Sequence, residues 1–232
     1  MEYSTENHLL VAQVSESEKA TFYKKTYLHL ALAVLAFIFV EAALIKIVPK
    51  EMILSMFQGK FTWLLILGAF WLASMLASRW TVAQSRGTQY LGLAFYVLIE
   101  AVIFLPMIYI ASYYSDASVI PQAAIITLAL FGGLTGVAFT SNRDFSFLRN
   151  IIIIGGFLSL GLIVAGALFG FNLGLWFSIG MVLLASASIL YETQKLKVTY
   201  TKDQYVGAAL QLFSSIMLLF WYVLRILMSR RD

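Results

Sequence analysis

Three carboxylates lie inside long apolar stretches of this chain, and a carboxylate in that setting can bind a cation or take up a proton. They are Glu41, Glu100 and Glu192. A charged side chain at the centre of a membrane helix costs about 2.5 to 3.5 kcal/mol on insertion scales, so each acid needs a partner, access to water or a function. These residues are therefore the first candidates for a functional site.

Glu100 is expected near the middle of the membrane, because it lies about eleven residues into its apolar stretch. Two interpretations stay open. Glu100 handles an ion or a proton, or a structural hydrogen bond holds it. Pro106, a turn and a half later, removes one backbone donor, and a kink there could open a water-filled pocket beside Glu100.

Glu192 lies closer to the end of its apolar stretch, at a depth similar to that expected for Arg79. An ion pair between these two side chains is therefore geometrically feasible. Protonation of Glu192 would abolish the attraction and release the two helices, so the pair could act as a latch. The alternative is that both side chains extend independently to the membrane surface.

The remaining polar residues of the apolar stretches indicate no catalytic or metal site. Glu41, five residues before Lys46, is expected to extend to the membrane surface. His29 is expected to be a hydrogen-bonded histidine, and His8 lies too far away to give metal-ligand spacing. Hydrolase and metalloprotease motifs are absent, as is cysteine, so we expect no enzyme, no catalytic residue and no cofactor.

The elements that carry these residues are expected to be membrane helices. Of 232 residues, 61% are hydrophobic and 12% charged, and the mean hydropathy is +0.85. Apolar runs of about 20 residues can cross the hydrocarbon layer as helices, whereas strands of a barrel alternate over about ten. The sequence therefore predicts an all-α integral membrane protein with seven transmembrane helices. The predicted spans are 26–48, 61–83, 89–114, 119–141, 150–171, 173–196 and 204–228.

Three segments follow from these spans: a polar N-terminal tail over 1–25, a seven-helix domain over 26–228 and a short C-terminal tail over 229–232. Within the N-terminal tail, Ser15 and Glu18 have the spacing of a capping box, which predicts a short surface helix leading into the first span.

Positive charges favour a cytosolic N-terminus, because ten lysines and arginines then lie on the cytosolic side and six on the other. The C-terminal tail opposes this orientation, since seven spans place its two arginines outside. The net charge of +4 comes mainly from residues flanking the spans, so it indicates topology and contact with the lipid bilayer rather than nucleic acid.

Small residues at four-residue spacing in the second half of the chain predict close helix packing. The pairs are Gly132 and Gly136, Gly155 and Ser159, Gly161 and Ala165, Gly166 and Gly170, and Gly174 and Ser178. The last span also has one polar face, which should be turned inward, so we expect this helix at the centre of the bundle. That face carries Gly207, Gln211, Ser214, Ser215, Leu218, Tyr222 and Arg225.

The two C-terminal spans resemble the signature end of the Bax-inhibitor/YccA family, which carries the transmembrane BAX inhibitor motif. The similar segments are Ala-Ser-Ile-Leu-Tyr-Glu-Thr-Gln, ending at Gln194, and the helix from Tyr205 to Leu227. The likeness extends to Tyr-Lys-Lys-Thr-Tyr in the first span and to Thr-Ser-Asn-Arg-Asp-Phe-Ser-Phe-Leu after the fourth. It covers nearly the whole chain, and the C-terminal part is its specific portion.

The resemblance implies seven helices with the last one central, and a pH-sensitive calcium leak. In such a leak two acids on the sixth and seventh spans share a proton, and an arginine of the second span latches one of them. Glu192 falls on the first acid and Arg79 on the latch. Ser215 occupies the position of the second acid, as in the YccA branch, whose bacterial members modulate the membrane protease FtsH.

Two functions are therefore expected. In the first, the chain is a pH-sensitive calcium leak, with Glu192 and Arg79 as sensor and latch, and Glu100 as a pore acid that could replace the missing second acid. Oxygen ligands for calcium would come from Glu100, Gln211, Ser214 and Ser215.

In the second, the chain is a non-conducting partner of FtsH, reached through its surface and residues 1–25. The absence of cysteine and the YccA-like pattern favour a bacterial inner membrane. A monomer is compatible with either function.

Overall fold

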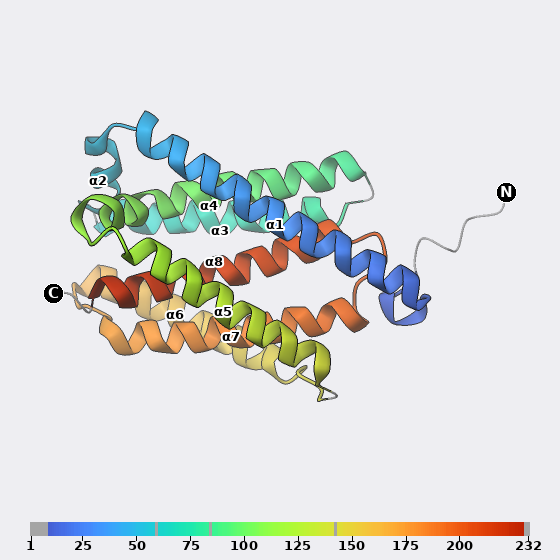
Figure 1. The fold of residues 1–232 in the computed structure, drawn as a ribbon. Coiled ribbons are helices and arrows are strands. Elements are labelled where there is room, and N and C mark those ends of the chain that lie inside the picture. Colours follow the sequence, from blue (N-terminus) through green and yellow to red (C-terminus); the bar gives the residue numbers. More distant parts are fainter. Residues whose placement is uncertain (1–8, 59, 84, 142, 230–232) are drawn as a thin grey trace.

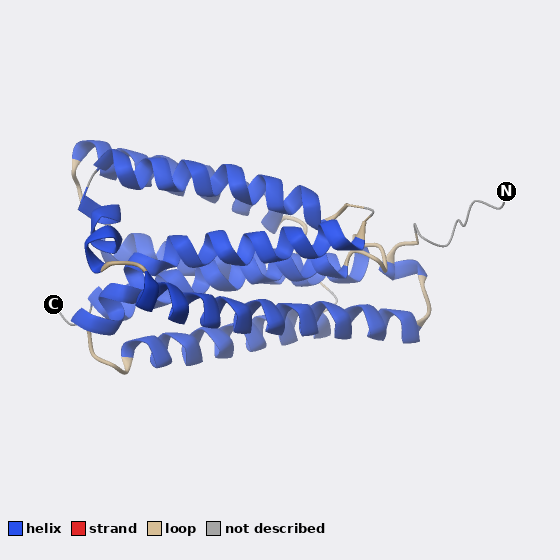
Figure 2. Cartoon of the chain, turned by 90° about the horizontal axis from the view of Figure 1, so that it is seen from above, coloured by secondary structure: helices blue, strands red, loops and turns tan. Residues whose placement is uncertain are grey.

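The structure is a computed structural model that describes residues 9–58, 60–83, 85–141 and 143–229. Long helices run side by side along one axis (Figures 1 and 2). The elements are η2 (Val11–Gln13), α1 (Glu16–Ile47), α2 (Lys50–Gln58), α3 (Lys60–Thr81), α4 (Arg86–Tyr114), α5 (Val119–Thr140), α6 (Leu148–Phe169), α7 (Gly174–Val198) and α8 (Tyr205–Ser229). Seven of these, all but η2 and α2, are long and apolar enough to cross a membrane. The predicted all-α integral membrane fold is confirmed.

The bundle has two ends, each defined by the helix connections that it holds. The N-terminal end is the one where α1 begins, and it also holds the connections α3–α4, α5–α6 and α7–α8 (Figure 1). The far end holds α2, the connections α4–α5 and α6–α7, and the end of α8 (Figure 1).

Helix α1 is longer than predicted, because it starts at Glu16 and runs without a break to Ile47. Its start is the predicted capping box: the Ser15 hydroxyl accepts from the Glu18 amide, and the Glu18 carboxylate accepts from the Ser15 amide. Residues 16–25, assigned to the polar tail from the sequence, thus form the first turns of α1 rather than a separate surface helix. Residues 1–8 of that tail lie outside the described residues.

The short helix α2 was not predicted. It follows Pro49, a residue that suits a helix start because its ring fixes φ and it has no amide hydrogen to leave unpaired. Ile53 anchors α2, since it is fully buried against Leu105 and Tyr109 of α4.

Helix α8 lies at the centre of the bundle, as its polar face predicted. It packs against α1, α3, α4, α5 and α7, while α6 lies at the edge against α7 and α3. The figures agree, because α8 runs between the α1–α4 side and the α5–α7 side (Figure 1). Helix α4 shares the core, and its chain continues as a helix through Pro106.

Close packing at glycine is confirmed at Gly155, where an added Cβ would lie 2.7 Å from the Leu184 Cδ1 of α7, and it also occurs where it was not predicted. A Cβ added to Gly92 would lie 2.8 Å from the Trp80 Cβ, so α3 and α4 touch there. A Cβ at Gly132, Gly136 or Gly161 would meet nothing within 4 Å, so the prediction of close packing was wrong at these positions. The physical reason is that α5 and α6 turn these glycines to the outside of the bundle, where four-residue spacing has no partner helix.

Candidate functional site

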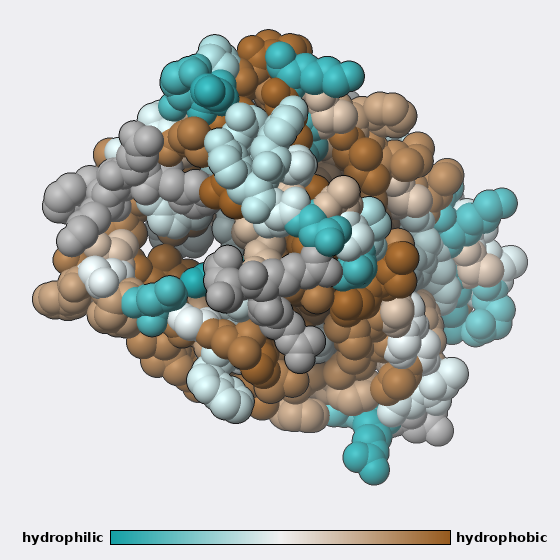
Figure 3. All heavy atoms as spheres, turned by 60° about the vertical axis from the view of Figure 1, so that its left-hand side comes forward, coloured by the Kyte–Doolittle hydropathy of each residue, from teal (hydrophilic) through white to brown (hydrophobic). Residues whose placement is uncertain are grey.

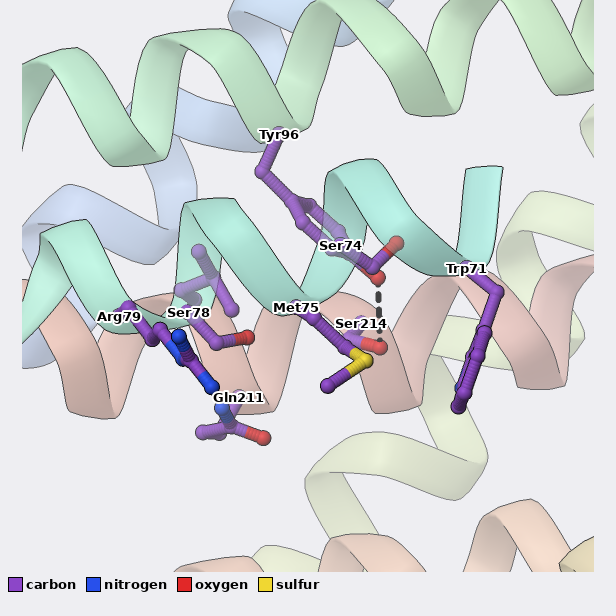
Figure 4. Close-up of a pocket in the computed structure, with 9 residues that line it drawn as sticks. Trp71, Ser74, Met75, Ser78, Arg79, Tyr96, Gln211 and Ser214 are labelled. Carbon is purple, nitrogen blue, oxygen red and sulfur yellow. Dashed lines mark hydrogen bonds between the residues drawn. The ribbon is translucent and has the colours of Figure 1, made fainter. Parts of the chain in front are cut away.

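A polar cavity of about 340 Å³ opens on the N-terminal half of the bundle, between α3, α4 and α8 (Figure 4). Arg79 and Gln211 extend toward one another across it (Figure 4). Arg79 forms no hydrogen bond or ion pair within the part of the chain that the structure describes. The other lining residues are Trp71, Ser74, Met75, Ser78, Tyr96, Leu210 and Ser214.

A larger groove of about 1190 Å³ runs along most of α6 to the far end of the bundle. Residues of α3, α4, α6, α7 and α8 line it. Figure 3 brings the far end forward and shows a hollow there. The lining is mostly aromatic and aliphatic, with a few polar groups. These are Glu100, Ser159, Asn172, Ser188, Ser214, Tyr222 and Arg225, together with Tyr96.

The cavity and the groove meet at one hydrogen bond. Trp71, Tyr96 and Ser214 line both spaces, and the Tyr96 hydroxyl donates to the Ser214 Oγ at 2.8 Å (Figure 4). Tyr96 is buried and Ser214 is half-buried, so the Tyr96 hydroxyl would be costly to leave without a partner. The two spaces together thus extend along most of the bundle, and the Tyr96–Ser214 contact separates them.

Glu100 lies on the groove wall, one helical turn beyond Tyr96 on the same face of α4. The residue is only 5% exposed, and its Oε2 atom has no hydrogen-bond partner. An ionised carboxylate with a free oxygen in such a place can accept a proton or a cation that enters the groove. Both interpretations of Glu100 stay predictions.

Glu192 lies elsewhere, at the N-terminal end of the bundle. Its Oε2 forms an ion pair with the Lys195 Nζ at 2.9 Å and accepts from the Tyr200 hydroxyl at 3.4 Å. Burial, and then the adjacent Glu192 carboxylate, raise the pKa of Tyr200, so this phenol stays protonated and remains a donor. Glu192 therefore has two local partners, one a turn away and one in the α7–α8 connection.

The predicted Arg79–Glu192 ion pair is not formed in this structure. Arg79 belongs to α3, which packs against α2, α4, α6 and α8, while Glu192 belongs to α7 on the other side of α8. Lys195 lies three residues from Glu192 on the same helix, so it reaches the carboxylate without bridging two helices. Similar depth in the membrane, the basis of the prediction, does not imply adjacency around the bundle.

Ser215, which occupies the position of the expected second acid, faces α7. Its hydroxyl is bonded to the Ser188 hydroxyl at 2.8 Å and to the Gln211 carbonyl at 3.0 Å. Ser215 lines neither of the two spaces, whereas its neighbour Ser214 lines both. Glu100 and Glu192 likewise share neither space, so the structure does not bring Glu100 to Glu192 as a replacement acid.

Sequence reasoning misplaced one acid and missed two partners. Glu41 was expected at the membrane surface, yet it is 4% exposed and neither carboxylate oxygen has a partner. Glu41 lies one turn after Phe37 on the buried face of α1, so its burial could have been predicted from this spacing. The position of Tyr96 beside Glu100 could also have been predicted, because Tyr96 precedes Glu100 by one turn. Tyr200 offered no comparable signal, since a loop places it beside Glu192.

His29 is a hydrogen-bonded histidine, as predicted. Its Nδ1 lies 2.7 Å from the Lys25 carbonyl oxygen, and its Nε2 lies 3.2 Å from the Tyr90 hydroxyl. Among the described residues, no three histidine or acidic side chains come together as a metal site.

The chain matches the family model described as "Inhibitor of apoptosis-promoting Bax1" over residues 19–232. It is 35% identical over 113 residues to an uncharacterized protein of Pseudomonas aeruginosa, covering 48% of this chain and 50% of that protein. It is 32% identical over 114 residues to an uncharacterized membrane protein of Vibrio cholerae, covering 47% and 49%.

A third relative, a BI1-like protein of Arabidopsis thaliana, is 30% identical over 126 residues, covering 49% of this chain and 46% of the plant protein. The matches thus span about half the length of these relatives. The family model, in contrast, covers almost the entire sequence. On that evidence, this chain belongs to the Bax inhibitor family of integral membrane proteins.

Proposed function

We propose that this protein is a pH-sensitive cation leak, with calcium as the favoured ion. The observation that carries the proposal is the meeting of the polar cavity and the groove at Tyr96 and Ser214, with Glu100 one turn away. Separation of this one hydrogen-bonded pair would join the two spaces. A cation crossing there would find the free Glu100 oxygen in an otherwise apolar wall.

The pH response is assigned to Glu192, through a chain of contacts. Ser188 lies one turn before Glu192 on α7 and is hydrogen-bonded to Ser215 of α8, the neighbour of Ser214. Protonation of Glu192 would abolish its ion pair with Lys195 and weaken the hydrogen bond that it accepts from Tyr200, the contact that ties this end of α7 to the α7–α8 connection. Movement of α7 would then act through Ser188 and Ser215 on the Tyr96–Ser214 contact.

The proposed orientation places the N-terminal end of the bundle in the cytosol, and a bacterial inner membrane is the proposed location. The ten lysines and arginines of the sequence count belong to the N-terminal end. In this orientation the polar cavity with Arg79 lies on the cytosolic half, and the groove extends to the external end.

The test is calcium flux into liposomes that hold the purified protein, at pH 6 and pH 8. Wild type should conduct more at the lower pH, because the Glu192 carboxylate is held less strongly by Lys195 and Tyr200 once it is protonated. Glu192→Gln removes the charge at any pH, so its flux at pH 8 should exceed that of wild type. Glu100→Gln should lose most of the flux at both pH values.

Lys24→Gln, a change of an exposed charge at the same end of the bundle, should behave as wild type. Absence of flux, or flux that neither acid substitution affects, would contradict the leak proposal.

The alternative function, modulation of FtsH, would use residues 1–25 as a polar handle. Against a free handle, the Val11 amide donates to the Tyr200 carbonyl at 2.8 Å, and α1 starts at Glu16, so the leak is favoured.

A further inference from the structure

The groove between α3 and α6 has features that conduction does not require. Its lining is predominantly apolar along its whole length and includes Leu67, Phe157, Leu160, Leu218 and Trp221. Its volume of about 1190 Å³ exceeds the roughly 300 to 1,000 Å³ of ordinary small-molecule pockets. A space of this kind in a membrane protein needs an apolar occupant.

The groove has one charged rim. Arg225, near the end of α8, lines the groove and forms no hydrogen bond or ion pair with any described residue. Asn172 of the α6–α7 connection and Tyr222 lie at the same end. Trp63 and Trp221 stack there with ring centroids 6.2 Å apart, and tryptophan favours the level of lipid headgroups. The rim thus offers an unpaired cation and neutral donors to an anion.

The α8 side of the groove is about as long as one lipid leaflet. From Arg225 to Ser214, the stretch of α8 that lines the groove, the helix rises about 16 Å at 1.5 Å per residue, while the lining of α6 continues to Ile152. Half of the roughly 30 Å hydrocarbon layer is about 15 Å. An acyl chain that starts at the level of Arg225 would therefore end near the Tyr96–Ser214 contact.

We propose that the groove binds an anionic phospholipid of the leaflet at the far end. The headgroup phosphate pairs with the Arg225 guanidinium, and one acyl chain lies along Trp221 and Leu218 between α3 and α6. Charge complementarity selects the headgroup, because a guanidinium binds phosphate with paired hydrogen bonds. The chain replaces water along a wall that is mostly hydrocarbon. The lipid site goes beyond the leak and does not depend on it, but the two share the groove, so an ion would cross only when the acyl chain has moved aside.

Native mass spectrometry of the full chain in detergent tests the proposal, with phosphatidylglycerol and phosphatidylcholine of identical chains. Wild type should retain phosphatidylglycerol with about tenfold higher affinity, a difference of about 1.4 kcal/mol. Arg225→Gln should lose this preference. Arg149→Gln removes the same charge at the start of α6, at the opposite end of the bundle from Arg225, and should keep the preference for phosphatidylglycerol.

A second variant tests the acyl chain separately. Gly156 lines the groove, and a Cβ there would meet nothing within 4 Å, so Gly156→Phe should fold and fill the space. It should weaken retention of both lipids about tenfold. Gly132→Phe adds the same side chain at an equally open site away from the groove, and it should leave retention unchanged.

Equal retention of the two lipids by wild type would overturn the proposal, and so would retention that Arg225→Gln and Gly156→Phe leave unchanged. Displacement of phosphatidylglycerol by inorganic phosphate alone would show an anion site without a lipid groove, which also contradicts it. The measurement involves no ion flux, so failure here leaves the leak proposal standing, and failure of the flux assay leaves the lipid site standing.

Discussion

At the scale of residues, Glu100 and Glu192 differ in what surrounds them, and this difference separates their proposed roles. Glu192 has a lysine and a phenol within hydrogen-bond distance, whereas Glu100 keeps one oxygen free on the wall of a groove. A paired carboxylate changes its contacts when it is protonated, and an unpaired one is available to a passing ion. We therefore assign sensing to Glu192 and ion contact to Glu100.

The Glu192–Lys195 ion pair should contribute to stability, because both side chains are largely buried. Lys195→Met leaves the carboxylate without its cation and should lower the free energy of unfolding by about 1 to 3 kcal/mol. Glu192→Gln combined with Lys195→Met should recover part of that loss. Unfolding in detergent mixtures at pH 8 measures both variants, with Lys24→Met as the exposed control. Additive effects of the two substitutions would show that the pair is not coupled.

At the scale of elements, the contact of α3 with α4 depends on Gly92, and the open faces of α5 and α6 tolerate bulk. Gly92→Ala would place a Cβ 2.9 Å from the Ala77 carbonyl oxygen, a backbone atom that cannot yield easily. We expect a loss of about 1 to 3 kcal/mol in the free energy of unfolding. Gly132→Ala should change it by less than about 1 kcal/mol, since the added methyl meets nothing.

The same unfolding assay compares the two glycine variants. A loss at position 132 equal to that at position 92 would contradict the packing described here. The comparison is informative because both glycines lie within membrane helices and the substitutions are identical.

The helices were predictable from the sequence, whereas their arrangement around the axis was only partly so. Long apolar runs determine where membrane helices lie, and the polar face of α8 correctly predicted its central place. The depth of a residue in the membrane follows from counting residues along its helix. The position of that helix around the bundle axis does not. For this reason Arg79 and Glu192 were paired in the prediction although α3 and α7 lie on different sides of α8. Close packing at Gly132 was predicted wrongly for the same reason, because residue spacing does not show which side of α5 faces another helix.

Residue spacing within a single helix predicted those contacts of the site that lie on one helix. The turn from Tyr96 to Glu100 and the capping box at Ser15 are both readable as spacings. The contact of Tyr200 with Glu192 depends on a loop, and the meeting of the cavity with the groove depends on three packed helices. Neither leaves a pattern in the residue order.

At the scale of the whole molecule, the two ends of the bundle differ in positive charge, and the proposed orientation follows from that difference. The chain contains no cysteine, so single cysteines can report sidedness without background. Ala117→Cys in the α4–α5 connection should react with an impermeant maleimide added outside intact cells. Thr199→Cys in the α7–α8 connection should react only after the membrane is opened. Both positions are exposed, and the reverse pattern would place the N-terminus outside.

The central claim is that an ion route passes between Tyr96 and Ser214, and the most direct measurement modifies that point. Ser214→Cys, reconstituted in liposomes, is treated with a cationic thiol reagent while calcium flux is recorded. Thr199→Cys, in an exposed connection, serves as the control. The account predicts that modification of position 214 stops most of the flux and that modification of position 199 does not. Flux that persists after complete modification of position 214 would contradict it.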